Sequence, residues 1–336
     1  MRTFLFLPPV HQPTGGVAVV AQLARILRAS GREAWLVLRQ GGSWLPEGVT
    51  DAAPMLAWED LALTPGDCWL VPEGWVNALA PGLNARCRCV SYVQNWAYLF
   101  SALPEGVGWR SLPVEFLAVS QPVAQFIEQA TGRAAPVLRP AVDPGRFAGA
   151  GEKPGGPVRV AYMPRKNKAL AAQIRAVFES RNAGADVEFT PIEGQDAAGV
   201  ARLLGGAHIF LATGFPEGCP LPPLEAMAAG CLGVGFTGFG GWDYMRQAQG
   251  APRFTPWWPL RAVPWGGNGF WCADADVLDA ALCLEEAVAL VRAGGPRLAA
   301  VLESARATAA AYDPAAQARA VDEIWSVWEA RGAVAS

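Results

Sequence analysis

Two glutamates, Glu217 and Glu225, stand eight positions apart in the run FPEGCPLPPLEAMAAG. The apolar residues 207–213 before them are typical of a buried strand, and the Gly and Pro residues that follow exclude regular structure. Pro222 suits the first turn of a helix, so Glu217 is predicted in a loop and Glu225 about one turn into a helix. The start of a helix offers unpaired N–H groups and the positive end of a dipole, which together bind phosphate.

Both carboxylates flank this helix start, and both can accept hydrogen bonds from hydroxyl groups. A ligand with a diphosphate in its middle, a sugar at one end and a ribose at the other fits that order of groups. The sequence therefore predicts a donor site for a nucleotide diphosphate-sugar. The loop residues expected to border the donor are Gly218, Cys219, Pro220 and Leu221. Cys219 is interpreted as a small filler of the loop, with a reactive thiol as the alternative.

The same segment resembles the Glu-x7-Glu signature of retaining glycosyltransferases with the GT-B fold, especially those of family 4. That signature usually continues as Pro-Leu-x-x-Leu-Glu-Ala-x-Ala-x-Gly, and this chain has PLPPLEAMAAG from Pro220 to Gly230. The resemblance implies that Glu217 contacts hydroxyls of the transferred sugar and that Glu225 contacts the nucleotide ribose. It also implies that catalysis needs neither a side-chain nucleophile nor a metal or other cofactor.

Three cations, Arg165, Lys166 and Lys168, follow the predicted strand Val158–Tyr162. A diphosphate leaving group gains negative charge as its bond to the sugar breaks, so cations at this loop stabilise the transition state. They also offset repulsion between the diphosphate and the two glutamates. The family has a basic pair in the matching loop, although here Pro164 replaces its Gly and the lysines come sooner. We expect Arg165 and Lys166 to act in catalysis and Lys168 to bind the donor; a solvated basic turn is the alternative.

Gly15 and Gly16 lie between the first predicted strand and the first predicted helix. Two glycines allow backbone N–H groups to approach an anion, and the family uses a similar loop against the donor diphosphate; a tight turn is the alternative. His11 precedes this loop, and Gln94 and Asn95 follow a strand, where polar residues face the ligand in a doubly wound sheet. These three residues are possible sugar or acceptor contacts, although His11 also suits a structural role.

A G-x-G-x-x-G motif with an acidic residue about 20 positions later is absent, as is G-x-x-x-x-G-K-[ST], which disfavours a nicotinamide site and a P-loop kinase. Asp274 and Asp276 form a D-x-D pair, which binds a divalent metal in another transferase fold. Because Asp276 immediately precedes the predicted helix Val277–Ala293, capping explains it without an ion. Three arginines share a face of the first predicted helix and are interpreted as solvated, so that membrane contact is at most peripheral: Arg25, Arg28 and Arg32.

The composition indicates a globular protein. The 336 residues are 52% hydrophobic and 17% charged, and a net charge of −3 gives no reason to expect a nucleic-acid partner. Seven irregularly spaced cysteines and two histidines form no zinc pattern, so the thiols are expected to be free and reduced. The apolar start MRTFLFLPP is too short for a signal peptide, and no apolar run approaches the roughly 18 residues of a membrane span. A cytoplasmic protein is therefore expected.

The order of predicted elements indicates an α/β protein with two domains. Apolar runs alternate with helical patterns in both halves of the chain, which is typical of parallel doubly wound sheets. A Gly- and Pro-rich linker at 148–157 separates residues 1–150 from residues 151–313. The expected strands are 3–8, Ala34–Leu38, 68–71, 89–93, 116–119, 137–138, Val158–Tyr162, 187–190 and 207–213. The expected helices are 17–29, Gln121–Thr131, 169–180, 197–204, a helix from Pro222, Val277–Ala293 and a last helix, 314–331.

The resemblance implies the GT-B fold, in which two Rossmann-like domains face a central cleft. Residues 1–150 then form the acceptor-side domain, on which helix 314–331 packs, and residues 151–313 bind the nucleotide-sugar, with residues 190–193 near its base. The expected activity is transfer of a sugar to a hydroxyl of a glycan, lipid-linked or small-molecule acceptor, as in polysaccharide biosynthesis. Two alternatives remain: another GT-B sugar-nucleotide enzyme (an epimerase or phosphorylase), and a non-catalytic nucleotide-sugar-binding subunit.

Overall fold

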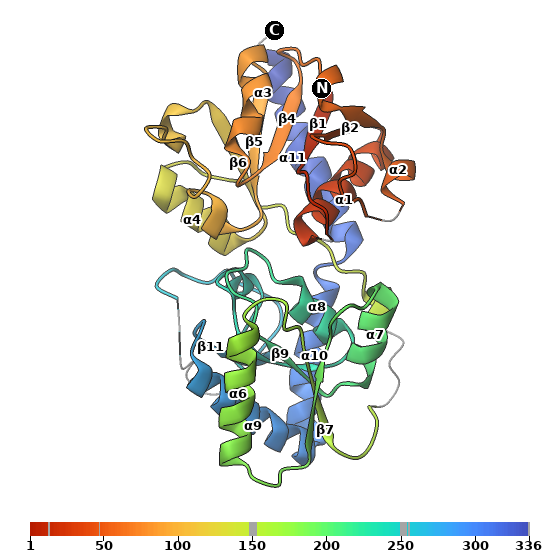
Figure 1. Cartoon of the computed structure of the whole chain (residues 1–336), viewed down its shortest axis with the longest axis vertical. Helices are drawn as coiled ribbons and strands as arrows, with labels where there is room; N and C mark the ends of the chain where they lie inside the picture. Colours follow the sequence, from red (N-terminus) through yellow and green to blue (C-terminus); the bar gives the residue numbers. More distant parts are fainter. Residues whose placement is uncertain (13, 47, 148–152, 249–253, 255, 335–336) are drawn as a thin grey trace. The chain divides into compact units, whose positions relative to one another are not determined.

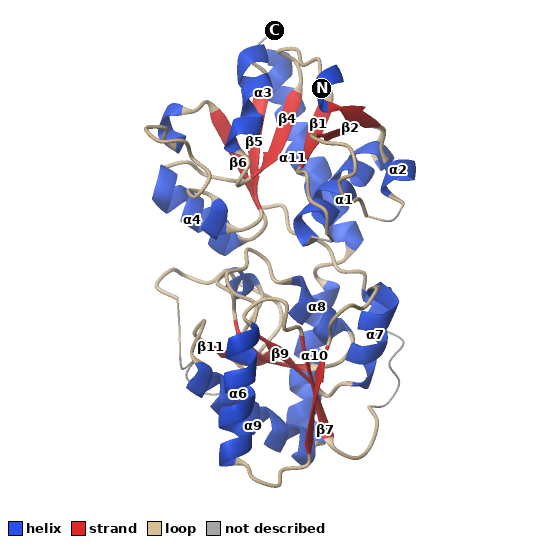
Figure 2. Ribbon diagram, viewed as in Figure 1, coloured by secondary structure: helices blue, strands red, loops and turns tan. Residues whose placement is uncertain are grey.

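The computed structural model describes residues 1–12, 14–46, 48–147, 153–248, 254 and 256–334. It contains two compact units (Figure 1): unit 1 comprises Met1–Pro140 with Ala315–Ser336, and unit 2 comprises Ala141–Pro314. Each unit is built on one parallel sheet with helices on its faces (Figure 2).

The division between the units falls after Pro140 and not at residue 150. Val142 already belongs to unit 2, because its backbone N–H donates to the carbonyl of Tyr312 at 2.8 Å. Phe147 is buried in the core of the same unit. Of the expected linker 148–157, residues 148–152 lie outside the described part of the chain.

Unit 1 contains a six-stranded sheet in the order β3-β2-β1-β4-β5-β6. The central strands β1 and β4 are buried at every position, which explains their continuous apolar runs. The strand order reverses between β1 and β4, the switch point of this doubly wound sheet. The strands are β1 (Thr3–Leu7), β2 (Ala34–Leu38), β3 (Met55–Ala57), β4 (Cys68–Pro72), β5 (Arg88–Val93) and β6 (Val114–Ala118). The helices are α1 (Gly15–Ala29), α2 (Val49–Ala52), α3 (Ala80–Ala85), α4 (Gln121–Thr131) and α11 (Pro314–Val334).

The last helix, α11, belongs to unit 1 from Ala315 onward and packs on its sheet. Trp325 is fully buried, and its indole N–H donates to the hydroxyl of Thr3 on β1 at 2.9 Å. The Trp325 ring also packs against Trp328, with 4.8 Å between the ring centroids. Residues from the two ends of the chain therefore form one core.

Arg32 forms ion pairs with α11 at the edge of this core. Its guanidinium lies 2.7 Å from Asp322 and 3.2 Å from Glu329, and only 12% of its side chain is exposed. The prediction that Arg32 is solvated is therefore wrong, because these two carboxylates come from a helix about 290 residues later in the chain. Arg25 and Arg28 are exposed, as predicted.

Unit 2 contains a five-stranded sheet in the order β11-β10-β9-β7-β8, one strand fewer than unit 1. Its switch point lies between β7 and β9. The strands are β7 (Val158–Tyr162), β8 (Val187–Pro191), β9 (Ile209–Ala212), β10 (Leu232–Phe236) and β11 (Gly269–Cys272). The helices are α5 (Pro144–Phe147), α6 (Lys168–Arg181), α7 (Ala197–Gly206), α8 (Leu221–Ala228), α9 (Val277–Ala293) and α10 (Gly295–Ala310).

Helices cover both faces of the unit 2 sheet. Successive side chains of a strand point to opposite faces, so neighbouring residues of one strand pack against different helices. Val160 on β7 lies in a core cluster with Ile174 of α6 and residues of α9. Its neighbour Ala161 lies in a second cluster with Leu224 of α8 and residues of α7 and α10. The alternation of strands and helices in the sequence thus produces a three-layer unit.

Strands β3, β10 and β11 and helices α2, α3, α5 and α10 were not predicted from the sequence. Glycine is unfavourable in a strand, and β10 (LGVGF) contains two. However, a Cβ on Gly233 would lie 2.4 Å from the Trp271 ring, and one on Gly235 would lie 2.3 Å from the Ala212 carbonyl oxygen. These glycines therefore permit close packing within the sheet.

The other predicted elements are confirmed to within a few residues, with one exception. The strand expected at 137–138 is only a single bridge between Val137 and Ala118. None of the helices in the described part of the chain is long and apolar enough to cross a membrane.

Replacing Trp325 tests whether α11 is part of the unit 1 core. Trp325→Ala should lower the free energy of unfolding by about 3–5 kcal/mol, because it leaves a large cavity and removes the bond to Thr3. Urea denaturation followed by circular dichroism measures this loss. Val327→Ala on the same helix is the control, since 49% of Val327 is exposed. Equal stability of the two variants would contradict this assignment.

Candidate functional site

The carboxyl ends of β7 and β9 meet at the switch point of the unit 2 sheet. Ligands of doubly wound sheets bind at this position, because the loops from the two neighbouring strands diverge there. Residues 163–167 follow β7, and residues 213–220 follow β9. These two loops carry the sequence-predicted Lys166 and Glu217.

Lys166 and Glu217 are in direct contact. Lys166 Nζ lies 2.8 Å from Glu217 Oε1, with 37% of the lysine side chain and 22% of the glutamate side chain exposed. The next residue, Asn167, ties the loops together, since its amide donates to the carbonyls of Thr213 at 3.0 Å and Phe215 at 2.8 Å. Asn167 has φ 59°, a left-handed conformation that Asn adopts more readily than most residues. The loops therefore present an ion pair that remains accessible to a ligand.

The amino end of α8 lies between Glu217 and Glu225 in the chain. Pro222 and Pro223 have no N–H, so Leu221 carries the one N–H among the first three helical residues. This end therefore has fewer N–H donors for a phosphate than the sequence pattern suggested. Binding of a phosphate there depends more on the helix dipole and on the cations of the loop after β7.

Glu225 lies on the second turn of α8. Burial raises the pKa of its carboxyl to about 6, and the positive charge of Arg146 opposes this shift. Arg146 lies on α5, before the strands of unit 2, and was not selected from the sequence. The available signal was its place in the run RPAVDPGRF, directly before the expected linker at 148–157.

The loop before α8 is fixed by contacts with the rest of unit 2. The hydroxyl of the buried Tyr244 donates to the carbonyl of Pro220 at 2.6 Å. The Gly218 carbonyl lies against Gly240, where a Cβ would come within 1.9 Å of its oxygen. Cys219 packs against apolar residues of the core beneath α8, as a small filler does.

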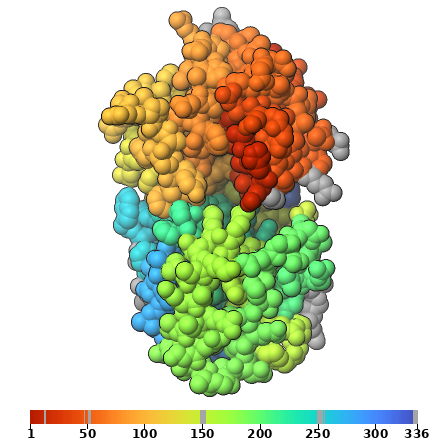
Figure 3. Space-filling view, in the orientation of Figure 1, coloured from red at the N-terminus to blue at the C-terminus, as the bar shows by residue number. Residues whose placement is uncertain are grey.

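Lys168 lies on the β8 side of the switch point. It is the first residue of α6, and its Nζ lies 3.8 Å from Glu193 Oε1. With Tyr162 and Pro191 it lines a cavity of about 350 Å³ at the carboxyl ends of β7 and β8, where the nucleotide base was expected. Helix α6 is on the surface of unit 2, and its yellow-green atoms are in view in Figure 3. Arg165 is exposed on the turn between β7 and α6.

The glycine loop of unit 1 lies beside Gln94. Gly15 and Gly16 are the first two residues of α1, which Thr14 caps by accepting the Val17 N–H at 3.4 Å. The Gln94 amide donates to the Gly16 carbonyl at 3.3 Å, and a Cβ on Gly16 would lie 3.3 Å from Gln94 Oε1. A Cβ on Gly15 would meet nothing within 4 Å. The approach of Gln94 thus explains a small residue at position 16 and joins the loops after β1 and β5.

A buried carboxyl, Glu73, holds the segment that contains Gln94 and Asn95. Its two oxygens accept the backbone N–H groups of Gln94 at 2.7 Å and Asn95 at 2.8 Å. Burial raises the pKa of Glu73 to about 7, although these N–H groups lower it. Asn95 in turn accepts the N–H of Ala97 at 3.1 Å. Glu73 was missed in the sequence; an acidic residue two positions after the predicted buried strand 68–71 was the available signal.

His11 was expected to be a possible sugar or acceptor contact, and Asp276 was expected to cap a helix. His11 is exposed in the loop after β1, and no hydrogen bond or ion pair in the described part of the chain joins it to Gly16 or Gln94. Asp276 caps α9, because its carboxylate accepts the Asp279 N–H at 2.9 Å. The cap predicted from the sequence is thus confirmed.

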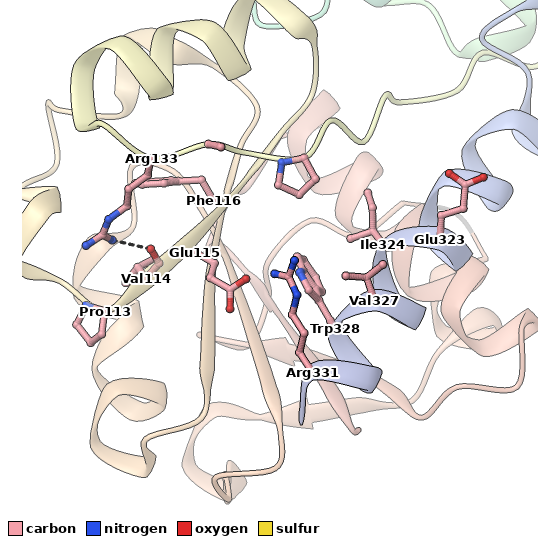
Figure 4. Close-up of a pocket in the computed structure, with 12 residues that line it drawn as sticks. Pro113, Val114, Glu115, Phe116, Arg133, Glu323, Ile324, Val327, Trp328 and Arg331 are labelled. Atoms are coloured by element: carbon pink, nitrogen blue, oxygen red, sulfur yellow. Dashed lines mark hydrogen bonds between the residues drawn. The ribbon is translucent and has the colours of Figure 1, made fainter. Parts of the chain in front are cut away.

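Unit 1 contains a cavity of about 660 Å³ (Figure 4). It is bordered by the first half of β6 and by Trp328 and Val327 of α11. Figure 4 shows Arg133 at its rim, donating to the Val114 carbonyl at 2.8 Å. None of the sequence-predicted site residues lines it, and it does not lie at the carboxyl end of β6.

The comparisons with known proteins agree with this architecture. No protein-family model matches the chain. An α-1,6-glucosyltransferase from Actinobacillus pleuropneumoniae serotype 7 is 27% identical over 237 residues, which cover 68% of this chain and 71% of the relative. HepE from Anabaena, solved in complex with UDP and glucose, superposes with a TM-score of 0.68 at 14% identity, covering 96% of this chain and 99% of that chain. The α,α-trehalose 6-phosphate synthase of Burkholderia multivorans gives a TM-score of 0.64 at 12% identity, covering 100% of both chains.

At 14% and 12% sequence identity, the similarity to these two solved structures establishes the fold of the chain. Two Rossmann-like units, each with a doubly wound parallel sheet, give the chain the GT-B fold. The fold class predicted from the sequence is therefore confirmed.

The Glu73 contacts predict a titration in unit 1. The backbone amide resonances of Gln94 and Asn95 should shift with a midpoint near the pKa of about 7, since both N–H groups bond this carboxyl. Nuclear magnetic resonance across this pH range measures the shift. Glu73→Gln should abolish it, whereas the exposed Glu128→Gln should not.

The same group predicts how stability changes with pH. Because the folded-state pKa of Glu73 lies above its ordinary value of 4.5, the folded protein holds this proton more tightly than the unfolded chain. Its contribution to the free energy of unfolding is present at low pH and is lost as the pH rises through about 7. The fall in urea midpoint between about pH 5 and about pH 8 should be smaller in Glu73→Gln than in Glu128→Gln. Identical falls, with unshifted amide resonances, would show that Glu73 is not the titrating group.

Proposed function

We propose that the chain is a retaining glycosyltransferase, which moves a hexose-type sugar from a nucleotide diphosphate-sugar to an acceptor hydroxyl. The observation that carries the proposal is the contact between Lys166 and Glu217 at the switch point of unit 2, next to the start of α8. In this arrangement Glu217 accepts hydrogen bonds from sugar hydroxyls, and Glu225 accepts them from the ribose. Lys166 and Arg165 bind the diphosphate between them.

The reaction then follows from the charges of these groups. The bond between the anomeric carbon and the diphosphate oxygen breaks, and its electron pair leaves with the diphosphate. The acceptor oxygen bonds to the anomeric carbon from the same face, and its proton passes to the departing diphosphate. Lys166, Arg165 and the α8 dipole stabilise the negative charge that grows on the leaving group. These groups take the place of a divalent metal in the proposal.

The named relatives support the choice of donor. The sequence relative is called a glucosyltransferase, and the HepE structure contains UDP and glucose. UDP-glucose is therefore the first donor to test, with a glycan, lipid-linked or small-molecule hydroxyl as acceptor. Polysaccharide biosynthesis in the cytoplasm, without nucleic acid and with at most peripheral membrane contact, belongs to the same proposal.

A panel of nucleotide-sugars in a thermal-shift assay identifies the donor, because a ligand stabilises the folded state that binds it. The donor found in this way should be hydrolysed slowly in the absence of acceptor. Binding without any turnover indicates a nucleotide-sugar-binding subunit instead. Conversion into another nucleotide-sugar indicates an epimerase, and turnover that requires inorganic phosphate indicates a phosphorylase.

Removing the Glu217 charge should lower turnover of the identified donor. Glu217→Gln is expected to reduce kcat by about two orders of magnitude, the typical cost of losing one preorganised polar group. Steady-state kinetics measure the loss. Glu188→Gln is the matched control, since this glutamate also pairs with a cation but is 56% exposed on β8. Unchanged kcat in Glu217→Gln would place the sugar elsewhere.

Glu225→Gln should weaken nucleotide binding more than it lowers kcat. Loss of one charge-assisted hydrogen bond to the ribose corresponds to about a tenfold rise in the Kd of the free nucleotide. Isothermal calorimetry with UDP and with the nucleotide of the identified donor measures this change. Glu303→Gln, an exposed residue of α10, controls for the loss of one negative charge in unit 2. Equal Kd values for the two variants would remove Glu225 from the site.

A further inference from the structure

The two members of the D-x-D pair have different surroundings. Asp276 is exposed and caps α9. Asp274 lies between β11 and α9 and is half-buried, with its Oδ1 accepting the backbone N–H of Gly238 at 2.7 Å. Burial raises the pKa of this carboxyl to about 6, and the neighbouring backbone N–H groups of Gly238, Thr237 and Phe239 oppose the shift. The Asp274 carboxylate is therefore held against the backbone of residues 237–239, whose N–H groups favour an anion.

These N–H groups belong to the loop that leaves β10. Gly238 and Phe239 have positive φ values of 65° and 72°, a region of backbone conformation that L side chains rarely adopt. Such a conformation costs a non-glycine residue about 1–3 kcal/mol and persists only where the surroundings hold it. The Asp274 carboxylate on one side and the ring of Trp258, 4.9 Å from that of Phe239, hold it here.

The opposite side of this loop is bonded to Glu217. The Glu217 N–H donates to the Gly238 carbonyl at 2.9 Å, and the Gly240 N–H donates to the Glu217 carbonyl at 3.0 Å. A Cβ on Gly238 would lie 2.8 Å from the Glu217 Cβ and 2.9 Å from the Gly214 carbonyl oxygen. The loop and the Glu217 backbone are thus in close contact, and a displacement of one displaces the other.

We infer that Asp274 is a positioning residue, which sets the position of the Glu217 carboxylate through the loop 237–240. Asp274 touches neither Glu217 nor Lys166 in this chain of contacts. It determines where the loop carbonyl and the Glu217 backbone lie, and thereby the direction in which the Glu217 side chain meets Lys166. This inference rests on the proposed function, because it assigns to Asp274 the alignment of the carboxylate that contacts the sugar.

The pair itself provides a matched experiment. Asp274→Ala should lower kcat by at least tenfold with less than a twofold change in donor KM, because alignment of Glu217 matters for the reaction while the nucleotide contacts remain. Asp274→Asn should recover part of the rate, since its amide oxygen can still accept the Gly238 N–H. Asp276→Ala removes only the helix cap, so it should lower the melting temperature and leave kcat unchanged. Loss of stability in Asp274→Ala with kcat equal to that of Asp276→Ala would overturn the inference.

Hydrogen exchange gives a readout that does not depend on activity. In Asp274→Ala the amides of Gly238, Glu217 and Gly240 should exchange faster than in the wild type and in Asp276→Ala. Unchanged exchange at Glu217 would overturn the inference even if activity falls. If the wild type turns over no donor, the proposed function fails, and faster exchange at Glu217 still establishes the coupling between Asp274 and this carboxylate.

Discussion

The parallel pairing of β7 with β9 is the constraint on which the candidate site depends. Val160 pairs with Ile209 and Tyr162 with Leu211, so the two strands end at nearly the same level. The loops that follow then start side by side, and Asn167 can bond across them to Thr213 and Phe215. A shift of one residue in this register would turn the buried side chains of β9 toward the opposite face of the sheet. The apolar core of unit 2 thereby fixes the distance between Lys166 and Glu217.

Much of the fold could be predicted because its signals are local. Apolar runs mark the buried strands, and the Gly and Pro residues around Glu217 mark the loop and the start of α8. Strand β10 was not predicted because its two glycines are required by close contacts with Trp271 and Ala212, which lie elsewhere in the chain. The partners within the site are long-range as well: Lys166 and Glu217 are 51 positions apart, and Asp274 and Gly238 are 36 apart. A single sequence shows which residues can do chemistry, but not which of them meet.

Three carboxyls in the described part of the chain have a pKa that burial raises. Burial raises the pKa of Glu73 to about 7 and those of Glu225 and Asp274 to about 6. Each group is near a switch point or the loop that holds Glu217, and each becomes charged at some cost to stability as the pH rises toward neutrality. Asp67 behaves differently: burial raises its pKa, but the bonds from Arg2 and Thr64 outweigh this effect and lower it. Asp67 thus has a structural role in unit 1, whereas Glu225 and Asp274 lie in unit 2 with the proposed site, and Glu73 holds the loop after β5 in unit 1.

The path of the chain has a consequence for biosynthesis. Unit 2 is one continuous segment, Ala141–Pro314, whereas unit 1 is assembled from Met1–Pro140 and the helix that begins after it. During translation Trp325, whose indole N–H bonds the Thr3 hydroxyl, is therefore synthesised after all of unit 2. Until then the β1 face that Trp325 covers stays open in the nascent chain, where exposed apolar surface favours aggregation and chaperone binding. The core of unit 1 consequently cannot be completed until the last helix has been made, although its sheet is synthesised before unit 2.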